Sequence, residues 1–197
     1  MYSIPTTVDI EGKQFKIRNS GDYRMVLDCF SALNDPELNT EERLFASLII
    51  FYEDLNELSD IQLLPNLETA VIKMFEFFNC GASKENARTT PYKLIDWDKD
   101  AQLICSAINK VAGTEIRTEE YIHWWTFMGY YSAIGECPLS SIIAIRSKIV
   151  KGKKLDKHEQ EFRQENPNYF IWSSRVDEAE AEDLFKQLWN SGGDIDG

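Results

Sequence analysis

The stretch YIHWWTFMGYYSAI, residues 121–134, decides how this chain folds, because six of its fourteen side chains are Trp, Tyr or Phe. On a helical wheel its large apolar side chains cover an arc of about 220°, whereas a helix that faces a core on one side needs about half of that. The pattern predicts a helix over 118–134, capped by Thr118. This helix is either buried on all sides at the centre of a bundle, or it turns part of its aromatic arc toward a groove or a partner.

Trp and Tyr are the residue types that most often anchor protein interfaces, because they bury a large area and keep one polar atom. The second interpretation therefore makes Trp124, Trp125, Tyr130 and Tyr131 candidate partner-binding residues. The other side of the helix carries small side chains near its middle, which allow another backbone to approach closely.

A second unusual helix follows, predicted from Ser140 or Ser141 to Gly152, and it places a cation among apolar side chains. Arg146 lies inside the arc that five Ile and Val side chains form, and not on the polar side of the helix. An arginine in that position must find a carboxylate, stack on an aromatic ring, or project its head from the edge of an interface.

The charge of the chain is distributed unevenly. Residues 146–163 hold seven Lys or Arg and three Asp or Glu, whereas the rest of the chain holds 14 and 30. One interpretation is a solvated helix end, because lysines are favourable near the C-terminus of a helix. The other is a basic patch that meets an acidic surface, such as that of another copy. In that case the partner-binding residues are Arg146, Lys148, Lys151, Lys153 and Lys154.

The remaining pattern predicts a mainly α protein, a compact helical bundle of about seven helices with a small N-terminal β-hairpin at about 6–18. Residues 82–95 have the composition of a mobile loop. We expect a single helical domain over 1–190 and a disordered acidic tail over 191–197. The other helices are predicted at 23–33, 40–52, 65–79, about 96–113, 156–165 and 177–190, the second of them capped within Thr40-Glu41-Glu42.

Composition argues against several classes of partner. The formal charge of −12 repels a polyanion, so we expect no nucleic acid. The longest apolar run, Leu48 to Tyr52, is far shorter than the ~20 residues of a membrane span, so we expect no membrane partner. The four cysteines lack metal-ligand spacing and lie in or beside apolar stretches, which predicts buried, reduced thiols in a cytoplasmic protein. They are Cys29, Cys80, Cys105 and Cys137.

No motif in the sequence supports catalysis, a cofactor or a metal site, and we expect a protein that is not an enzyme. The segment DWDKD, residues 96–100, opens like a calcium loop, but Ala101 and Ala107 stand where that loop needs Gly and Glu. Asp96 or Asp98 is expected to cap a helix instead. Residues 147–154 end like a phosphate-binding loop, but Ser147 replaces its first glycine.

Three stretches together resemble the bacteriophage Gp-fifteen (Gp15) family. They are the hairpin VDIEGKQFKI at 8–17 with the aromatic-rich helix after it, the segment HWWTFMGYY at 123–131, and the segment from IRSK at 145–148 to GKKLDK at 152–157. The resemblance is strongest over 118–166 and is colinear over the first hundred residues.

The family resemblance implies a function. Members are small cytoplasmic proteins of long-tailed phages and prophages of Gram-positive bacteria, and their gene typically lies between those of the major tail protein and the tape-measure protein. That is the position of tail assembly chaperones. The resemblance implies a non-catalytic chaperone in the host bacterial cytoplasm that binds the tape-measure protein, keeps it soluble and is absent from the mature virion. The major tail protein and further copies stacked head to tail are expected partners. The alternative is a minor structural tail or connector component.

Overall fold

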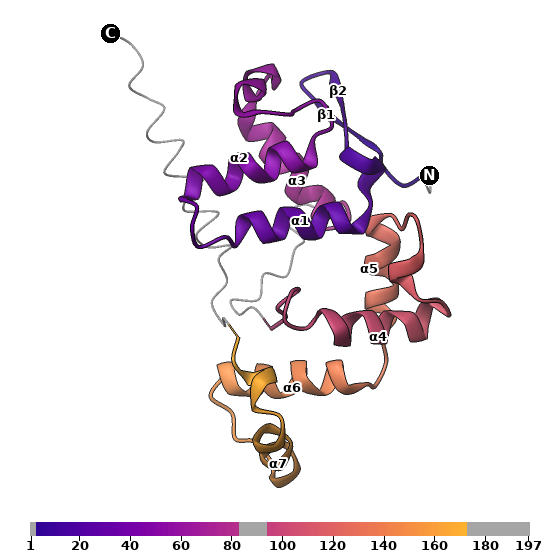
Figure 1. The fold of residues 1–197 in the computed structure, drawn as a ribbon, viewed down its shortest axis with the longest axis vertical. Coiled ribbons are helices and arrows are strands. Elements are labelled where there is room, and N and C mark those ends of the chain that lie inside the picture. Colours follow the sequence, from indigo (N-terminus) through magenta and orange to yellow (C-terminus); the bar gives the residue numbers. More distant parts are fainter. Residues whose placement is uncertain (1–2, 83–93, 173–197) are drawn as a thin grey trace. The chain divides into compact units, whose positions relative to one another are not determined.

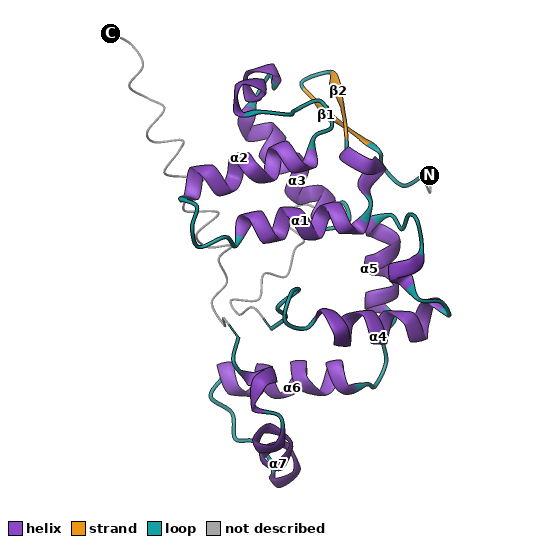
Figure 2. Cartoon of the chain, viewed as in Figure 1, coloured by secondary structure: helices purple, strands orange, loops and turns teal. Residues whose placement is uncertain are grey.

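The computed structural model describes residues 3–82 and 94–172, and these are mainly α-helical (Figure 2). Contacts within the chain divide the described residues into two compact units. Unit 1 comprises 3–82 and 121–126, and unit 2 comprises 94–120 and 127–172. Most of the predicted loop at 82–95, the predicted helix at 177–190 and the predicted tail at 191–197 lie outside the described residues. A single domain over 1–190 stays a prediction.

Unit 1 opens with the predicted β-hairpin, in which β1 (Thr7–Ile10) pairs antiparallel with β2 (Lys13–Lys16). Its turn contains only Glu11 and Gly12, and both have positive φ angles, 52° and 83°. Two positive φ angles are what the type I′ turn of a two-residue hairpin requires. The alternation along β2 then turns Phe15 into the core.

Helices build the rest of unit 1. The α-helices are α1 (Tyr23–Leu33), α2 (Thr40–Phe51) and α3 (Leu67–Phe78), and the 3₁₀ helices are η1 (Arg18–Gly21) and η2 (Leu58–Leu63). Helices α1 and α2 run side by side, and α3 packs against α2 and β1 (Figure 1). The predicted ranges for α1, α2 and α3 agree with these bounds to within two residues.

Side-chain caps set where these helices begin. Asp22 accepts a backbone N–H from the first turn of α1, and Asn66 does the same for α3. Asn39 caps α2 and forms a capping box with Glu42. The predicted cap within Thr40-Glu41-Glu42 is therefore one residue late, because the amide of Asn39 already satisfies two N–H groups of the first turn.

Aromatic rings fill the core of unit 1. The ring of Phe51 meets those of Tyr52, Phe77 and Phe78 edge to face, with centroid distances of 4.8, 5.4 and 5.7 Å. The Tyr52 hydroxyl donates to the carbonyl of Ala70 at 2.8 Å, and burial raises the pKa of that hydroxyl. The end of α2 is thereby held against α3.

A cation closes the C-terminal end of α2. Arg18 donates from Nε to the carbonyl of Ile50 at 3.1 Å, and from Nη2 to the carbonyls of Ile49 and Tyr52, each at 3.0 Å. These carbonyls have no partner within the helix and carry the negative end of its dipole. Arg18 therefore fixes η1 on the end of α2, a role that no sequence pattern indicated.

Unit 2 is a second helical assembly. It contains α4 (Ala101–Ala112), η3 (Ile116–Thr118), α6 (Pro138–Val150), α7 (Lys157–Glu165) and η4 (Pro167–Phe170). Helix α6 packs on α4, and η4 packs on α7. Helix α5 (Trp124–Ser132) contributes residues 124–126 to unit 1 and residues 127–132 to unit 2. A mainly α fold with a small N-terminal hairpin is thus confirmed, and no helix of the described residues is long and apolar enough to cross a membrane.

The predicted start of the aromatic helix at Thr118 is wrong. Helix α5 begins at Trp124, because the residues before it are extended and bonded to the start of α1. The carbonyl of Ile122 accepts the N–H of Tyr23 at 2.9 Å, and the N–H of Ile122 donates to Asp22 Oδ2 at 3.0 Å. Residues held by these long-range bonds are not helical, so the 220° arc does not describe residues 121–123.

The cysteines are free, but the prediction that all four are buried is wrong. Only Cys29 is buried; Cys105 and Cys137 are half-buried, and Cys80 is exposed. Cys80 follows the last turn of α3 with a positive φ of 54°, so it belongs to the outward turn and not to the apolar face of the helix. Burial raises the pKa of the Cys29 thiol, which keeps it protonated and unreactive.

Gly21 provides a test of the packing between η1 and the extended residues 121–123. Its φ is +80°, and a Cβ there would lie 2.7 Å from Phe77 Cζ and 2.9 Å from His123 Nε2. We expect Gly21→Ala to lower the free energy of unfolding by about 2–5 kcal/mol, combining backbone strain with overpacking. Gly113→Ala is the control, because φ is +75° there and nothing lies within 4 Å. Urea unfolding followed by circular dichroism measures both, and equal losses would contradict this packing.

Candidate partner-binding surfaces

Trp124 and Trp125 are adjacent in sequence but differ in burial. Trp124 is 1% exposed, and its indole N–H donates to the carbonyl of Phe78 at 2.9 Å. Trp125 is half-buried, and its indole N–H donates to the carbonyl of Phe77 at 2.9 Å. Trp124 is therefore a core residue of unit 1, whereas Trp125 is held by its polar atom with part of its ring at the surface.

His123 fixes the backbone at the start of α5. Its Nδ1 accepts the N–H of Trp125 at 3.1 Å, so Nε2 carries the proton and donates to the carbonyl of Pro5 at 3.0 Å. Burial lowers the pKa of His123, and the Pro5 carbonyl and the Asp22 carboxylate offset part of that shift. The imidazole is therefore a neutral structural group that bonds the N-terminal segment to α5.

Tyr130 and Tyr131, the other two aromatic candidates, are half-buried and lie in unit 2. The ring of Tyr131 packs on Trp97 with a centroid distance of 5.8 Å, and Trp97 also packs on Phe127 at 6.3 Å. Burial and the nearby Asp100 and Cys137 raise the pKa of Tyr131 to about 12. The four predicted aromatic residues are thus divided between the two units.

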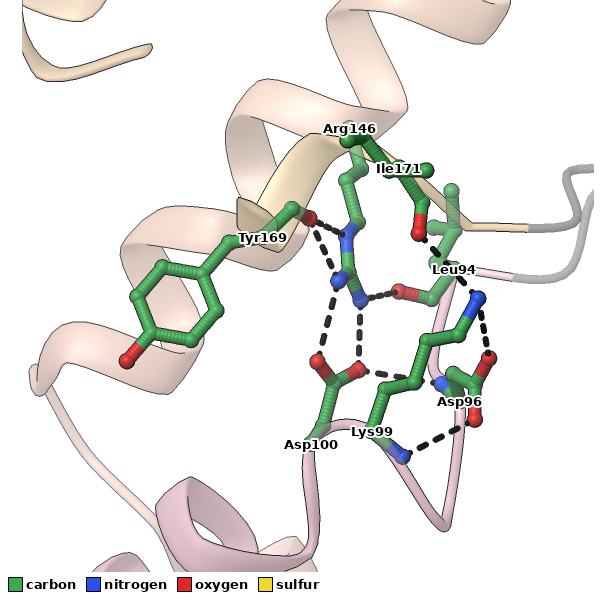
Figure 3. Close-up of polar contacts among 7 residues, drawn as sticks. All are labelled: Leu94, Asp96, Lys99, Asp100, Arg146, Tyr169 and Ile171. Atoms are coloured by element: carbon green, nitrogen blue, oxygen red, sulfur yellow. Dashed lines mark hydrogen bonds and ion pairs between the residues drawn. The ribbon is translucent and has the colours of Figure 1, made fainter. Parts of the chain in front are cut away.

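Arg146 and Asp100 are the two buried charged groups among the described residues of unit 2, each with 1% of its side chain exposed (Figure 3). Arg146 forms a bidentate ion pair with Asp100, from Nη1 to Oδ2 at 2.5 Å and from Nη2 to Oδ1 at 2.9 Å. Nη1 also donates to the carbonyl of Leu94, and Nε and Nη2 donate to that of Tyr169. All five N–H groups of the guanidinium therefore have an acceptor.

An aromatic ring completes this site. The guanidinium carbon of Arg146 lies 4.9 Å from the ring centre of Trp172, a cation–π distance. The sequence predicted three possible environments for Arg146, and the structure supplies two of them, a carboxylate and an aromatic ring. Its contacts fix the fold of unit 2, and its predicted role in partner binding has no exposed surface to act through.

The predicted caps of α4, Asp96 and Asp98, are wrong. Asp100 occupies the N-cap position, and its carboxylate pairs with Arg146 instead of capping the helix. It also accepts the backbone N–H of Asp96 at 3.0 Å, while the Asp96 carboxylate accepts the N–H of Lys99. The carboxylates of Asp96 and Asp100 thus hold the turn before α4 together (Figure 3).

The predicted lysines lie around the end of α6. Lys148 is half-buried and pairs with Glu159 of α7, whereas Lys151, Lys153 and Lys154 are exposed. The N–H of Lys153 donates to the carbonyl of Lys148, and that of Gly152 to Ile149, which is a Schellman motif. The turn that ends α6 therefore presents three cations to solvent.

A surface of a different kind lies in unit 1 and was missed by sequence reasoning. Leu58 and Leu63 of η2 are 62% and 50% exposed, and Glu53, Asp54 and Glu57 beside them in the chain are also exposed. We call these five residues the leucine surface. From the sequence alone, a leucine in a short segment is expected to be buried in the core. Only the 3₁₀ conformation of η2 reveals that these two leucines point outward.

No cluster of three or more His, Cys, Asp or Glu side chains within residues 3–82 and 94–172 is arranged to hold a metal ion. The buried polar atoms of the same residues all have hydrogen-bond partners. The features that stand out are surfaces of apolar and charged side chains, which are suited to contact with another protein.

Comparison with known families assigns the chain. The family model described as Bacteriophage Gp15 protein matches residues 2–170, which is most of the chain, so the protein belongs to the bacteriophage Gp15 family. This confirms the resemblance seen in the sequence. Neither a comparison with curated proteins nor one with solved structures finds a match.

His123 predicts how stability depends on pH. Because its pKa is lowered in the folded state, the unfolded chain binds a proton near pH 6.5 that the native chain does not. The contribution of the neutral His123 to the free energy of unfolding is therefore complete above pH 6.5 and decreases as the pH falls below it. Urea unfolding should show a lower free energy of unfolding at pH 5.5 than at pH 7.5, and we expect His123→Gln to remove part of this difference. The control is His158→Gln, since the His158 side chain is 95% exposed; an equal effect of both variants would contradict this role.

Arg146 and its exposed neighbours provide a second prediction. We expect Arg146→Met to lower the free energy of unfolding by about 3–5 kcal/mol, because the carboxylate of Asp100 stays buried without its partner. Lys153→Ala should change it by less than about 0.5 kcal/mol. The double variant Arg146→Met/Asp100→Leu should lose less than the single variants Arg146→Met and Asp100→Leu together. Chemical denaturation of the wild type and these four variants measures this, and a loss for Arg146→Met no larger than that of Lys153→Ala would refute the role of the ion pair.

Proposed function

We propose that this chain is a tail assembly chaperone, which binds the tape-measure protein in the host cytoplasm and keeps it soluble until the tail is assembled. Membership of the bacteriophage Gp15 family supports a phage function. A tape-measure protein is a long helical protein with apolar faces that aggregate when they are bare. A helical module that covers such a face needs apolar anchors and a soluble outer surface, and it needs no catalytic group.

The observation that best supports this proposal is that the ring of Trp125 is both fixed in orientation and partly exposed. Its indole N–H is bonded to the carbonyl of Phe77, so the orientation of the ring is fixed before any partner arrives. The ring is only half-buried, which leaves apolar area for a partner to cover. An aromatic anchor that is already ordered loses little side-chain entropy on binding, and Trp is enriched among the residues that dominate binding energy.

Charge supports the same function. The described residues of unit 1 hold 14 Asp or Glu and six Lys or Arg, so this unit is strongly acidic. The complex with a bound apolar tape-measure protein would have a high negative charge. Charge repulsion between such complexes keeps them in solution.

The proposal predicts a separation between stability and client binding. We expect Trp125→Ala to keep most of the stability but to lose the ability to keep the co-expressed tape-measure protein in the soluble fraction. Trp124→Ala should instead lower the free energy of unfolding by about 3–5 kcal/mol, because that ring is buried. Thermal melts and the soluble fraction after co-expression in a bacterial host measure the two effects.

The control variant is Tyr121→Ala, which removes an exposed aromatic ring of the same unit. It should leave the tape-measure protein soluble. If the wild-type chain does not keep its tape-measure protein in solution, or if Trp125→Ala does so as well as the wild type, the chaperone assignment or its anchor is wrong. Presence of the chain in purified virions would favour the alternative, a minor structural tail or connector component.

A further inference from the structure

The leucine surface has the composition of half an interface. Leu58 and Leu63 supply exposed apolar area, and the exposed carboxylates of Glu53, Asp54 and Glu57 precede Leu58 in the chain. The segment is ordered before binding, because the Asp60 carboxylate accepts the N–H groups of Asn56 and Glu57 at 2.8 and 3.2 Å. An exposed apolar side chain close to acidic side chains fits a partner that offers a hollow and the opposite charge.

Unit 2 carries an open hollow whose lining includes a cation. An open depression on α7 is lined by Leu155, Gln160, Arg163 and Gln164. Its wall therefore combines one apolar side chain, two amides and one cation. The exposed Lys153 and Lys154 immediately precede it in the chain. The loop that joins α6 to α7 supplies both the lysines and Leu155 (Figure 1).

We propose that copies of this chain associate head to tail, with Leu58 of one copy seated in the α7 depression of the next. The acidic residues of the leucine surface would face Lys153, Lys154 and Arg163 of the neighbouring copy. The two surfaces differ, so the contact is heterologous and leaves one free surface at each end. Association through it continues beyond a dimer. This inference goes beyond the chaperone function, because it requires no tape-measure protein.

Charge identifies a second copy as the occupant. The described part of unit 1 is strongly acidic, with 14 acidic and six basic side chains, and it supplies the acidic partner that the lysines of unit 2 require. Nucleic acid is a poorer partner for these lysines, because the whole chain carries a charge of −12 and Asp156 and Glu161 lie among the cations. The contact is steered by opposite charges and therefore weakens as salt increases.

Sedimentation velocity of the purified, nuclease-treated chain tests the proposal. The wild type should form species larger than a dimer as its concentration increases at low salt, and high salt should reduce them. Leu58→Asp and Arg163→Glu should each be monomeric when studied alone. An equimolar mixture of these two variants should form a dimer and nothing larger. Arg163→Glu keeps an intact leucine surface and Leu58→Asp keeps an intact α7 depression, so one contact forms and no matching pair of surfaces remains. That mixing result distinguishes a head-to-tail contact from a symmetric one.

Two matched variants serve as controls. Ile4→Asp makes the same chemical change at another exposed apolar residue of unit 1, and Lys110→Glu makes the same charge change on α4. Both should associate as the wild type does, and circular dichroism melts should show that all four variants are folded. A wild type that is monomeric at every soluble concentration, a mixture without dimers, or association abolished by nuclease treatment would each overturn the proposal.

Discussion

Burial of the Arg146 guanidinium is the constraint around which unit 2 is built. A charged group removed from water is tolerated only when its donors are satisfied, and here five N–H groups find acceptors on three residues of two separate segments. Asp100 before α4, the carbonyl of Leu94 and the carbonyl of Tyr169 are all fixed by one side chain of α6 (Figure 3). The positions of these segments therefore depend on each other, because displacing any of them leaves part of a buried cation unpaired.

Unit 1 uses a buried carboxylate in a related way. Asp22 is 6% exposed and stands at the N-cap of α1, where it accepts the backbone N–H of Arg24. Its other oxygen accepts the N–H of Ile122, a hundred residues further along the chain. In both units a buried aspartate thus stands at the N-cap position of a helix, where the helix dipole favours a negative charge. In both units it also binds a segment that is distant in sequence.

This pattern explains how much of the structure the sequence could predict. The helices with regular apolar spacing and local end signals, such as α1 and α2, were found because their bounds depend on nearby residues. The start of α5 was missed, because Ile122 is held extended by Asp22 and no local pattern records that bond. Arg146 was recognised as unusual from its place in an apolar arc, but many carboxylates are available and its partner Asp100 could not be chosen. The exposure of Leu58 was hidden for the converse reason, since an apolar residue in a short segment resembles core.

The use of Arg146 for folding changes how the basic segment should be understood. A cation that is saturated by five hydrogen bonds has no donor left for a partner, so the attraction of this region for an acidic surface rests on side chains at its rim. Lys151, Lys153 and Lys154 are exposed there, and the Schellman turn at Gly152 fixes the backbone from which they project. Arg146 is buried within the same helix and bonds to residues of the fold. The fold therefore separates the charge that positions α6 from the charges that remain available to another protein, and loss of either kind should produce a different defect.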